Sequence, residues 1–197
     1  LVAWLATSHS SSRAMLLLAM VIVWGVRLAL HIGARNLGKS EDSRYRKWRE
    51  EWGHNATVRA YFQVFLLQGL LAVVVLLPVT HVITQQASAL TILDAIGAAL
   101  WLVGFVFEAV GDLQLARFKR DLRNRGRIIT SGLWQYSRHP NYFGEVTLWW
   151  GVWIIACSAA GGWKTILGPS MITALILWVS GIPMLEQKYR GNLEFEH

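Results

Sequence analysis

The chain has 197 residues, of which 54% are hydrophobic and only 16% are charged. Soluble domains carry about a quarter charged residues, so this composition argues against an ordinary soluble domain. The formal net charge is +7, and its position along the chain separates nucleic-acid binding from membrane orientation.

Five apolar stretches are each long enough to cross a bilayer as a helix of roughly 20 residues. They lie near 14–34, 60–79, 90–111, 142–160 and 165–185. Strands are not expected, because an isolated sheet cannot satisfy its backbone hydrogen bonds in lipid. The sequence therefore predicts an all-α, polytopic transmembrane helix bundle of about five to seven spans. We expect one integral membrane domain over residues 1–197.

Proline and glycine mark the expected helix boundaries. Pro140 suits the first turn of the fourth helix, where a missing amide hydrogen costs nothing. Pro78 is expected to end the second span, and Pro183 to lie near the end of the fifth. The pair Gly161-Gly162 is expected to form the turn between the fourth and fifth spans.

Lysine and arginine are concentrated in two loops and the tail. The first loop holds Arg35, Lys39, Arg44, Arg46, Lys47, Arg49 and Arg59, the second holds Arg117, Lys119, Arg120, Arg123, Arg125, Arg127 and Arg138, and the tail adds Lys188 and Arg190. The intervening loops carry only Lys164, with Arg13 as a further exception. If the helices alternate, the basic segments share one side, which the positive-inside rule makes cytoplasmic. Membrane orientation thus explains the charge, and we expect membrane lipids and no nucleic acid as partners.

Arg27, His31 and Arg35 recur every four residues near the end of the first helix, so they share one face. Arg27 lies one or two turns inside the apolar stretch, where a charged side chain normally faces the bundle interior or a wet cavity. The alternative for both arginines is that they reach the lipid headgroups. His31 could equally be a core histidine.

The third helix ends in FEAVGDLQLARFKRDLRNRGR, residues 107–127. Glu108 and Asp112 are four residues apart and share a face, while Asp112 and Gln114 lie where lipid gives way to water. The density of arginine after them fits a ligand that carries several phosphates, because guanidinium groups match phosphate oxygens. A patch for anionic lipid headgroups is the alternative.

The segment YSRHPNYFGE, residues 136–145, is rich in polar side chains and is followed directly by an uncharged apolar stretch. Asn141 and Glu145 share a helix face, and a buried carboxylate needs a partner, a proton or a ligand. An amide beside an acid could hold a carboxamide such as a nicotinamide, or the pair could link neighbouring helices. Gly144 leaves room for a flat ring or another helix. The spacing of histidines and carboxylates predicts no metal site.

Three stretches carry a resemblance to a known family: SGLWQYSRHPNYFGE, with EAVGDLQLARFKRD upstream and SGIPMLEQKYRGN downstream. Together they resemble the bacterial steroid 5-alpha-reductase-like membrane proteins of the DUF1295 family. WGVRLALHIGARNLGKSEDSRY is also similar, so the resemblance extends from about Trp24 to Asn192. It implies a location in the bacterial inner membrane. The chain begins with Leu1, and it lacks the run of tyrosine and basic residues with which members of this family usually end. We therefore expect both ends to be truncated.

The resemblance implies an NADPH-dependent reductase that transfers a hydride to an activated C=C bond of a steroid- or lipid-like substrate. Steroid reductases hold the nicotinamide carboxamide with an Asn-x-x-x-Glu pair, which Asn141 and Glu145 match. The cofactor would bind from the cytoplasmic side, through these two residues and Arg27, Arg35, Asp112, Gln114, Lys119, Arg120, Arg138, His139, Tyr142 and Glu186. The candidate catalytic residues are His31, Tyr45 and Glu145. The early helix with the family's substrate-holding glutamate is missing, which puts the steroid substrate in doubt.

A second activity is compatible with the same segment. Isoprenylcysteine carboxyl methyltransferases, of the same superfamily, share an Arg-His-Pro-x-Tyr-x-Gly segment that residues 138–144 also match. The alternative is therefore an S-adenosylmethionine-dependent membrane methyltransferase. Those enzymes usually carry two adjacent glutamates before the last loop, whereas here Glu186 is followed by Gln187. A lipid-binding protein without catalysis is a third reading, and the sequence does not indicate an oligomeric state.

Overall fold

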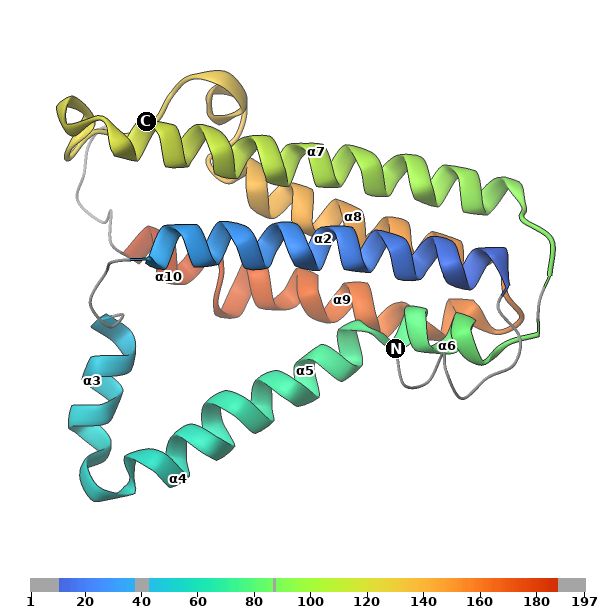
Figure 1. Cartoon of the computed structure of the whole chain (residues 1–197), viewed down its shortest axis with the longest axis horizontal. Helices are drawn as coiled ribbons and strands as arrows, with labels where there is room; N and C mark the ends of the chain where they lie inside the picture. Colours follow the sequence, from blue (N-terminus) through green and yellow to red (C-terminus); the bar gives the residue numbers. More distant parts are fainter. Residues whose placement is uncertain (1–10, 38–42, 87, 188–197) are drawn as a thin grey trace.

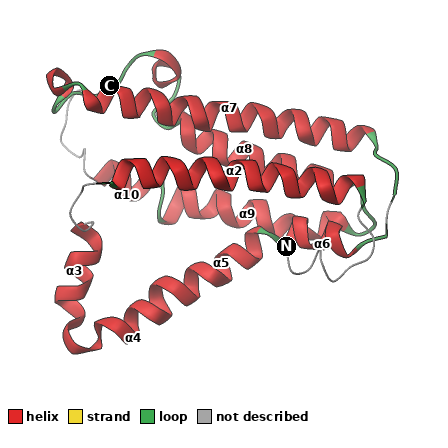
Figure 2. Ribbon diagram, in the orientation of Figure 1, coloured by secondary structure: helices red, strands yellow, loops and turns green. Residues whose placement is uncertain are grey.

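The computed structural model describes residues 11–37, 43–86 and 88–187, and its regular elements are helices (Figure 2). The α-helices are α2 (Ser12–Asn36), α3 (Ser43–Trp52), α4 (Ala56–Ala60), α5 (Leu67–Val75), α6 (Leu77–Thr84), α7 (Ile92–Arg120), α8 (Pro140–Ala156), α9 (Leu167–Ala174) and α10 (Ile182–Glu186). The π-helical segments are η2 (Tyr61–Leu66) and η6 (Leu175–Val179), and the 3-10 turns are η1 (Gly53–Asn55), η3 (Leu122–Asn124), η4 (Gly132–Gln135) and η5 (Gly162–Ile166). The predicted all-α class is confirmed.

Within the described residues, four helical stretches are long and apolar enough to cross a membrane: Ser12–Asn36, Arg46–Val75, Ile92–Arg120 and Gly162–Glu186. The chain is therefore an integral membrane protein whose outward apolar side chains contact lipid. The expected span near 142–160 corresponds to α8, which has 17 residues. At 1.5 Å per residue such a helix is about 26 Å long, slightly short of the hydrocarbon core. The expected number of five to seven spans stays a prediction.

Helix boundaries follow the proline and glycine positions with one correction. Pro140 occupies the first turn of α8, and Gly161 has a φ of 75° in the turn before η5, both as expected. Pro78 does not end a span, because α5 already ends at Val75 and Pro78 lies in the first turn of α6. Pro183 lies near the end of the helical stretch Gly162–Glu186, as expected, and begins its last segment, α10. In both places the ring sits where a helix does not need the amide hydrogen.

α7 and α8 pack backbone against backbone. Glycines recur every seven residues along both helices: Gly97, Gly104 and Gly111 on α7, and Gly144 and Gly151 on α8. A Cβ on Gly104 would lie 2.5 Å from the main-chain nitrogen of Leu148 and 2.6 Å from the oxygen of Gly144. Small residues allow this approach, because no side chain stands between the helix axes. α8 runs antiparallel to α7, so its first turns lie beside the last turns of α7.

α2 runs parallel to α7 and is joined to it by ion pairs at the start of both helices and further along them. Arg13 binds Asp94 with Nε and Oδ1 2.7 Å apart, and Arg27 binds Glu108 further along both helices. The core between α2, α6, α7 and α8 includes Leu17, Met20, Val79, Val82, Trp101, Leu148, Trp149, Val152 and Ile155. Figure 1 shows α2 and α7 starting at the same end of the bundle. The ends of α2 and α7 and the start of α8 therefore share the other end.

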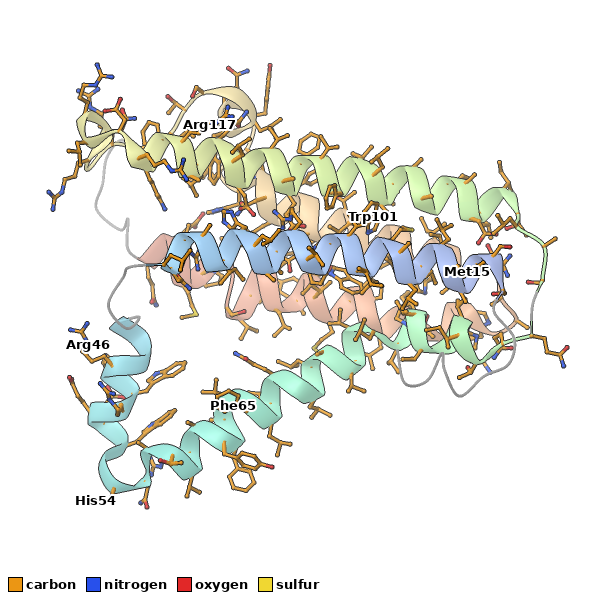
Figure 3. The ribbon with its side chains drawn as sticks, in the orientation of Figure 1. Met15, Arg46, His54, Phe65, Trp101 and Arg117 are labelled. Atoms are coloured by element: carbon orange, nitrogen blue, oxygen red, sulfur yellow. The ribbon has the colours of Figure 1, made fainter. Side chains whose placement is uncertain are left out.

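A helical arm of α3, α4, η2 and α5 leads away from this bundle (Figure 1). It returns at the end of α5, where a Cβ on Gly168 of α9 would lie 3.0 Å from the carbonyl oxygen of Val75. Phe65, labelled in Figure 3, is 69% exposed on the arm and illustrates its apolar, lipid-facing character.

Candidate functional site

A cluster of charged side chains lies between α2 and α7. Arg27 donates from Nη1 to Oδ2 of Asp112 at 2.7 Å and from Nη2 to Oε1 of Glu108. The side chains of Glu108 and Asp112 are only 4% and 12% exposed. Because both partners of Arg27 are on α7, its guanidinium group faces the bundle interior and not the lipid headgroups.

Trp24 completes the surroundings of Glu108. Its Nε1 donates to Oε2 of Glu108 at 3.0 Å, so both oxygens of this carboxylate accept hydrogen bonds. The indole ring of Trp24 also packs edge-on against Trp149 of α8, with ring centroids 5.2 Å apart. An aromatic contact and a charge-assisted hydrogen bond thus hold Trp24 between α7 and α8.

Asn141 joins the cluster from the first turn of α8. Its Nδ2 donates to Oδ1 of Asp112 at 3.2 Å. Gly111 permits this contact, since a Cβ there would lie 3.2 Å from the main-chain nitrogen of Asn141. The Oδ1 atom of Asn141 is buried and accepts no hydrogen bond from the described part of the chain. Asp112 therefore orients the amide and leaves an acceptor unused.

Glu145 lies one turn further along α8 and interacts electrostatically with Arg27, Glu108 and Asp112. No described residue donates a hydrogen bond to its carboxyl group. Three carboxyl groups thus surround one guanidinium group. Burying such an excess of acid is costly unless a proton or a hydrogen-bond donor compensates it.

Gly144 has the second of the two roles considered for it. A Cβ there would meet the carbonyl oxygen of Gly104 at 2.5 Å and Cα of Glu108 at 2.9 Å. α7 therefore fills the space beside Gly144 and leaves no room there for a flat ring. This close approach brings the backbone of Glu108 next to the turn that carries Glu145.

The other candidates on the first basic segment lie at different distances from the cluster. Nε2 of His31 is 3.7 Å from Oδ2 of Asp112, so His31 borders the cluster. Arg35 is exposed in the last turn of α2, outside these contacts. Tyr45 belongs to α3, and its side chain lies outside the described residues. Its assignment stays a prediction.

A second polar group joins α8 to α10. Nε2 of His139 and Oε1 of Glu186 are 3.1 Å apart, and the ring of His139 stacks on Tyr142 at 5.5 Å. The Nδ1 atom of His139 is buried without a partner among the described residues. Glu186 is thereby brought to His139, 47 residues earlier in the chain, and to its neighbour Tyr142, beside Asn141.

The remaining candidates lie at the end of α7 and in the loop that follows. Oε1 of Gln114 accepts a hydrogen bond from the amide of Leu133 at 3.0 Å, so this side chain holds η4 against α7. Lys119, Arg120 and Arg138 are exposed at the same end of the bundle. The hydrogen bonds from Arg123 hold the pKa of Asp121, just beyond α7, below its ordinary value.

The described residues also form an apolar hollow of about 560 Å³ along α3, α4 and η2, lined by residues that include Trp48, Trp52, Tyr61 and Phe65. The rings of Trp48 and Trp52 stack there with centroids 5.6 Å apart. All of its lining residues belong to the arm and none belongs to the charged cluster, so we do not include the hollow in the site.

Two residues of the cluster were not assigned to the site from the sequence, Glu108 and Trp24. The sequence could have indicated Glu108, because it lies on the same face as Asp112 within an apolar helix, where ionisable residues are rarely without function. Trp24 lies three residues before Arg27, which places it on the same helix face.

Comparisons with known proteins give one family and one distant relative. The family model described as "Protein of unknown function (DUF1295)" matches residues 1–197. Over 67 residues, the chain is 34% identical to a Bos taurus protein named 3-oxo-5-alpha-steroid 4-dehydrogenase 1. That match covers 34% of this chain and 26% of the relative, about a quarter of its length. No solved structure matches the chain.

Proposed function

The chain belongs to the DUF1295 family, and we propose that it is a membrane reductase that uses NADPH to reduce an activated C=C bond of a lipid-like substrate. The name of the bovine relative describes an oxidoreductase of a 3-oxo steroid, which supports this class of reaction. An apolar substrate also suits a site enclosed by membrane helices.

The observation that carries the proposal is an unused acceptor on α8, the side-chain oxygen of Asn141. Oδ1 of Asn141 is buried without a donor, and Glu145, one turn away, receives no hydrogen bond from the described residues. Buried polar atoms are nearly always hydrogen-bonded, so the free oxygen of Asn141, with the carboxyl group of Glu145 one turn away, indicates a ligand with N–H donors. A nicotinamide carboxamide offers an NH₂ group with two donors, and the acceptors of the site fit it.

The neighbouring residues support the same orientation. Asp112 accepts from Nδ2 of Asn141 and thereby keeps the amide oxygen available. Arg27 in turn holds Asp112. The phosphates of NADPH would be held at the basic end of the bundle, by Lys119, Arg120 and Arg138, since guanidinium and ammonium groups match phosphate oxygens.

When bound, NADPH supplies the hydride. The carbon at the other end of the reduced double bond then needs a proton, and we assign its delivery to His31, which borders the cluster at 3.7 Å from Asp112. Tyr45 is the second candidate for this role. The surrounding apolar helices exclude bulk water from the site.

Ligand titration tests the proposal. The protein in detergent micelles is titrated with NADPH and, separately, with S-adenosylmethionine, while the unfolding temperature is measured. A ligand at 100 times its Kd stabilises the native state by about 2.7 kcal/mol, or roughly 5–10 °C for a chain of this size. We expect this shift with NADPH. A shift with S-adenosylmethionine alone would instead support a methyltransferase and end the reductase proposal.

Two substitutions locate the binding site. Asn141→Ala and Glu145→Ala are each expected to abolish the NADPH shift, because each removes an acceptor for the carboxamide. The matched controls Asn55→Ala and Glu51→Gln change the same residue types at exposed positions of the arm and should preserve it. An unchanged shift in both α8 variants would remove these residues from the site.

A further inference from the structure

A second buried ion pair lies far from the cluster, and the proposed reaction does not use it. Nε of Arg13 is 2.7 Å from Oδ1 of Asp94, and Nη2 is 2.9 Å from Oδ2. Both residues are 2% exposed. Figure 3 labels Met15 near this end of α2, and Arg117 near the opposite end of α7. The pair therefore lies at the end of the bundle opposite the basic segments.

The two ion pairs have the same spacing on both helices. In each pair the partners are 81 residues apart in the chain, so Arg13 precedes Arg27 by as many residues as Asp94 precedes Glu108, namely fourteen. Fourteen residues are two heptads, the repeat of a coiled-coil seam. Halfway between them lie Met20 and Trp101, both buried in the core.

The pair at the far end is held in one geometry. Beyond the two-pronged contact with Asp94, Arg13 donates to Oγ of Ser88 and to the carbonyl oxygen of Ala89. Asp94 also accepts from the amide and hydroxyl groups of Thr91, which closes the capping box of α7. Every one of these partners lies at the start of α7 or just before it, so Arg13 can satisfy its donors in one register only.

The contacts of Arg27 in the charged cluster do not fix the register of α2 against α7 in this way. Its two carboxylates on α7, Glu108 and Asp112, are one helical turn apart, so a slide of one turn would still leave Arg27 beside an acid. Asp94, by contrast, is the one acidic residue between Thr91 and Phe107. A slide of one turn, about 5 Å, would leave Arg13 and Asp94 buried and unpaired.

We propose that Arg13 and Asp94 are positioning residues: they set the register of α2 against α7 and so place Arg27 between Glu108 and Asp112. The distance between the two pairs is about 21 Å along the helix axis. The register itself is independent of the proposed function, whereas its effect on cofactor binding rests on that function.

Spin-label distances test the register directly. Labels are attached to Ile32→Cys on α2 and Leu113→Cys on α7, positions that are 41% and 48% exposed, after Cys157→Ala removes the native thiol. With Arg13 and Asp94 intact we expect one narrow distance distribution. Arg13→Met combined with Asp94→Asn removes both charges and is expected to add a population displaced by about 5 Å, one helical turn.

Controls separate positioning from general stability. Ser11→Ala removes the N-cap of α2, whose hydroxyl accepts from Ala14 at 3.1 Å, without touching α7, and should keep the single distribution. Should the paired variant not fold, Arg13→Gln carries the same expectation. A native distribution in the variant that folds would overturn the proposal. NADPH titration of the same samples adds weaker binding as a second readout, and if the native protein binds no NADPH, the distances alone decide.

Discussion

Replacing Gly104 by alanine is expected to force α7 and α8 apart and to lower the thermal stability of the protein. The added Cβ would lie 2.5 Å from the amide nitrogen of Leu148 and 2.9 Å from its Cβ, where ordinary contact begins near 3.4 Å. The nearest atom belongs to the backbone, so the helices themselves must separate, by roughly 1 Å. Inserting a methyl group into so close a contact costs about 1–3 kcal/mol.

Thermal unfolding followed by tryptophan fluorescence measures this loss. A change of 1–3 kcal/mol corresponds to a decrease in Tm of about 2–12 °C for a chain of this size. Gly33→Ala is the matched control, because a Cβ on this helical glycine has no atom within 4 Å. It should keep or raise the Tm, since alanine favours the helix. If Gly104→Ala unfolds no earlier than Gly33→Ala, the close packing of α7 and α8 is refuted.

Three further predictions concern charged groups. Arg27→Gln should lower the unfolding free energy by about 3–5 kcal/mol in denaturant titrations, because it leaves buried carboxylates uncompensated; a native value would mean that water already reaches them. Trp24→Phe removes the donor to Glu108 and should cost about 1.5–3 kcal/mol by the same method, and no loss would rule out that hydrogen bond. Arg123 depresses the pKa of Asp121 in the folded state, so the stability it contributes is present above the ordinary carboxyl pKa and is lost as pH falls through the folded value. Arg123→Ala should therefore raise this pKa in a carbon-13 NMR titration, and an unmoved titration would contradict the contact.

Hydrophobic runs were sufficient to predict the all-α fold class and roughly where its long helices lie, because helices are the main way to satisfy backbone hydrogen bonds in lipid. They could not predict which helices are neighbours. Arg27 was expected to face the interior, but its partners Glu108 and Asp112 are 81 and 85 residues away in the chain. Periodicity identifies the face of a helix and contains no information about what packs there.

The spacing of Asn141 and Glu145 was sufficient to place them on one helix face. The sequence left two uses open for Gly144, and only the packing of α8 on α7 decided between them. Pro78 was misplaced because a proline signals the end of one helix and the first turn of the next equally well, and here Leu76 already interrupts the helix.

The long chain separation within the ion pair of Arg27 has a consequence for biosynthesis. Ribosomes add about 5–20 residues per second, so Glu108 follows Arg27 by roughly 4–16 s. During this interval α2 leaves the translocon with an arginine that has no acidic partner, at an insertion cost of about 2.5–3.5 kcal/mol if it reaches the bilayer centre. α2 can therefore settle fully only after α7 has emerged to meet it.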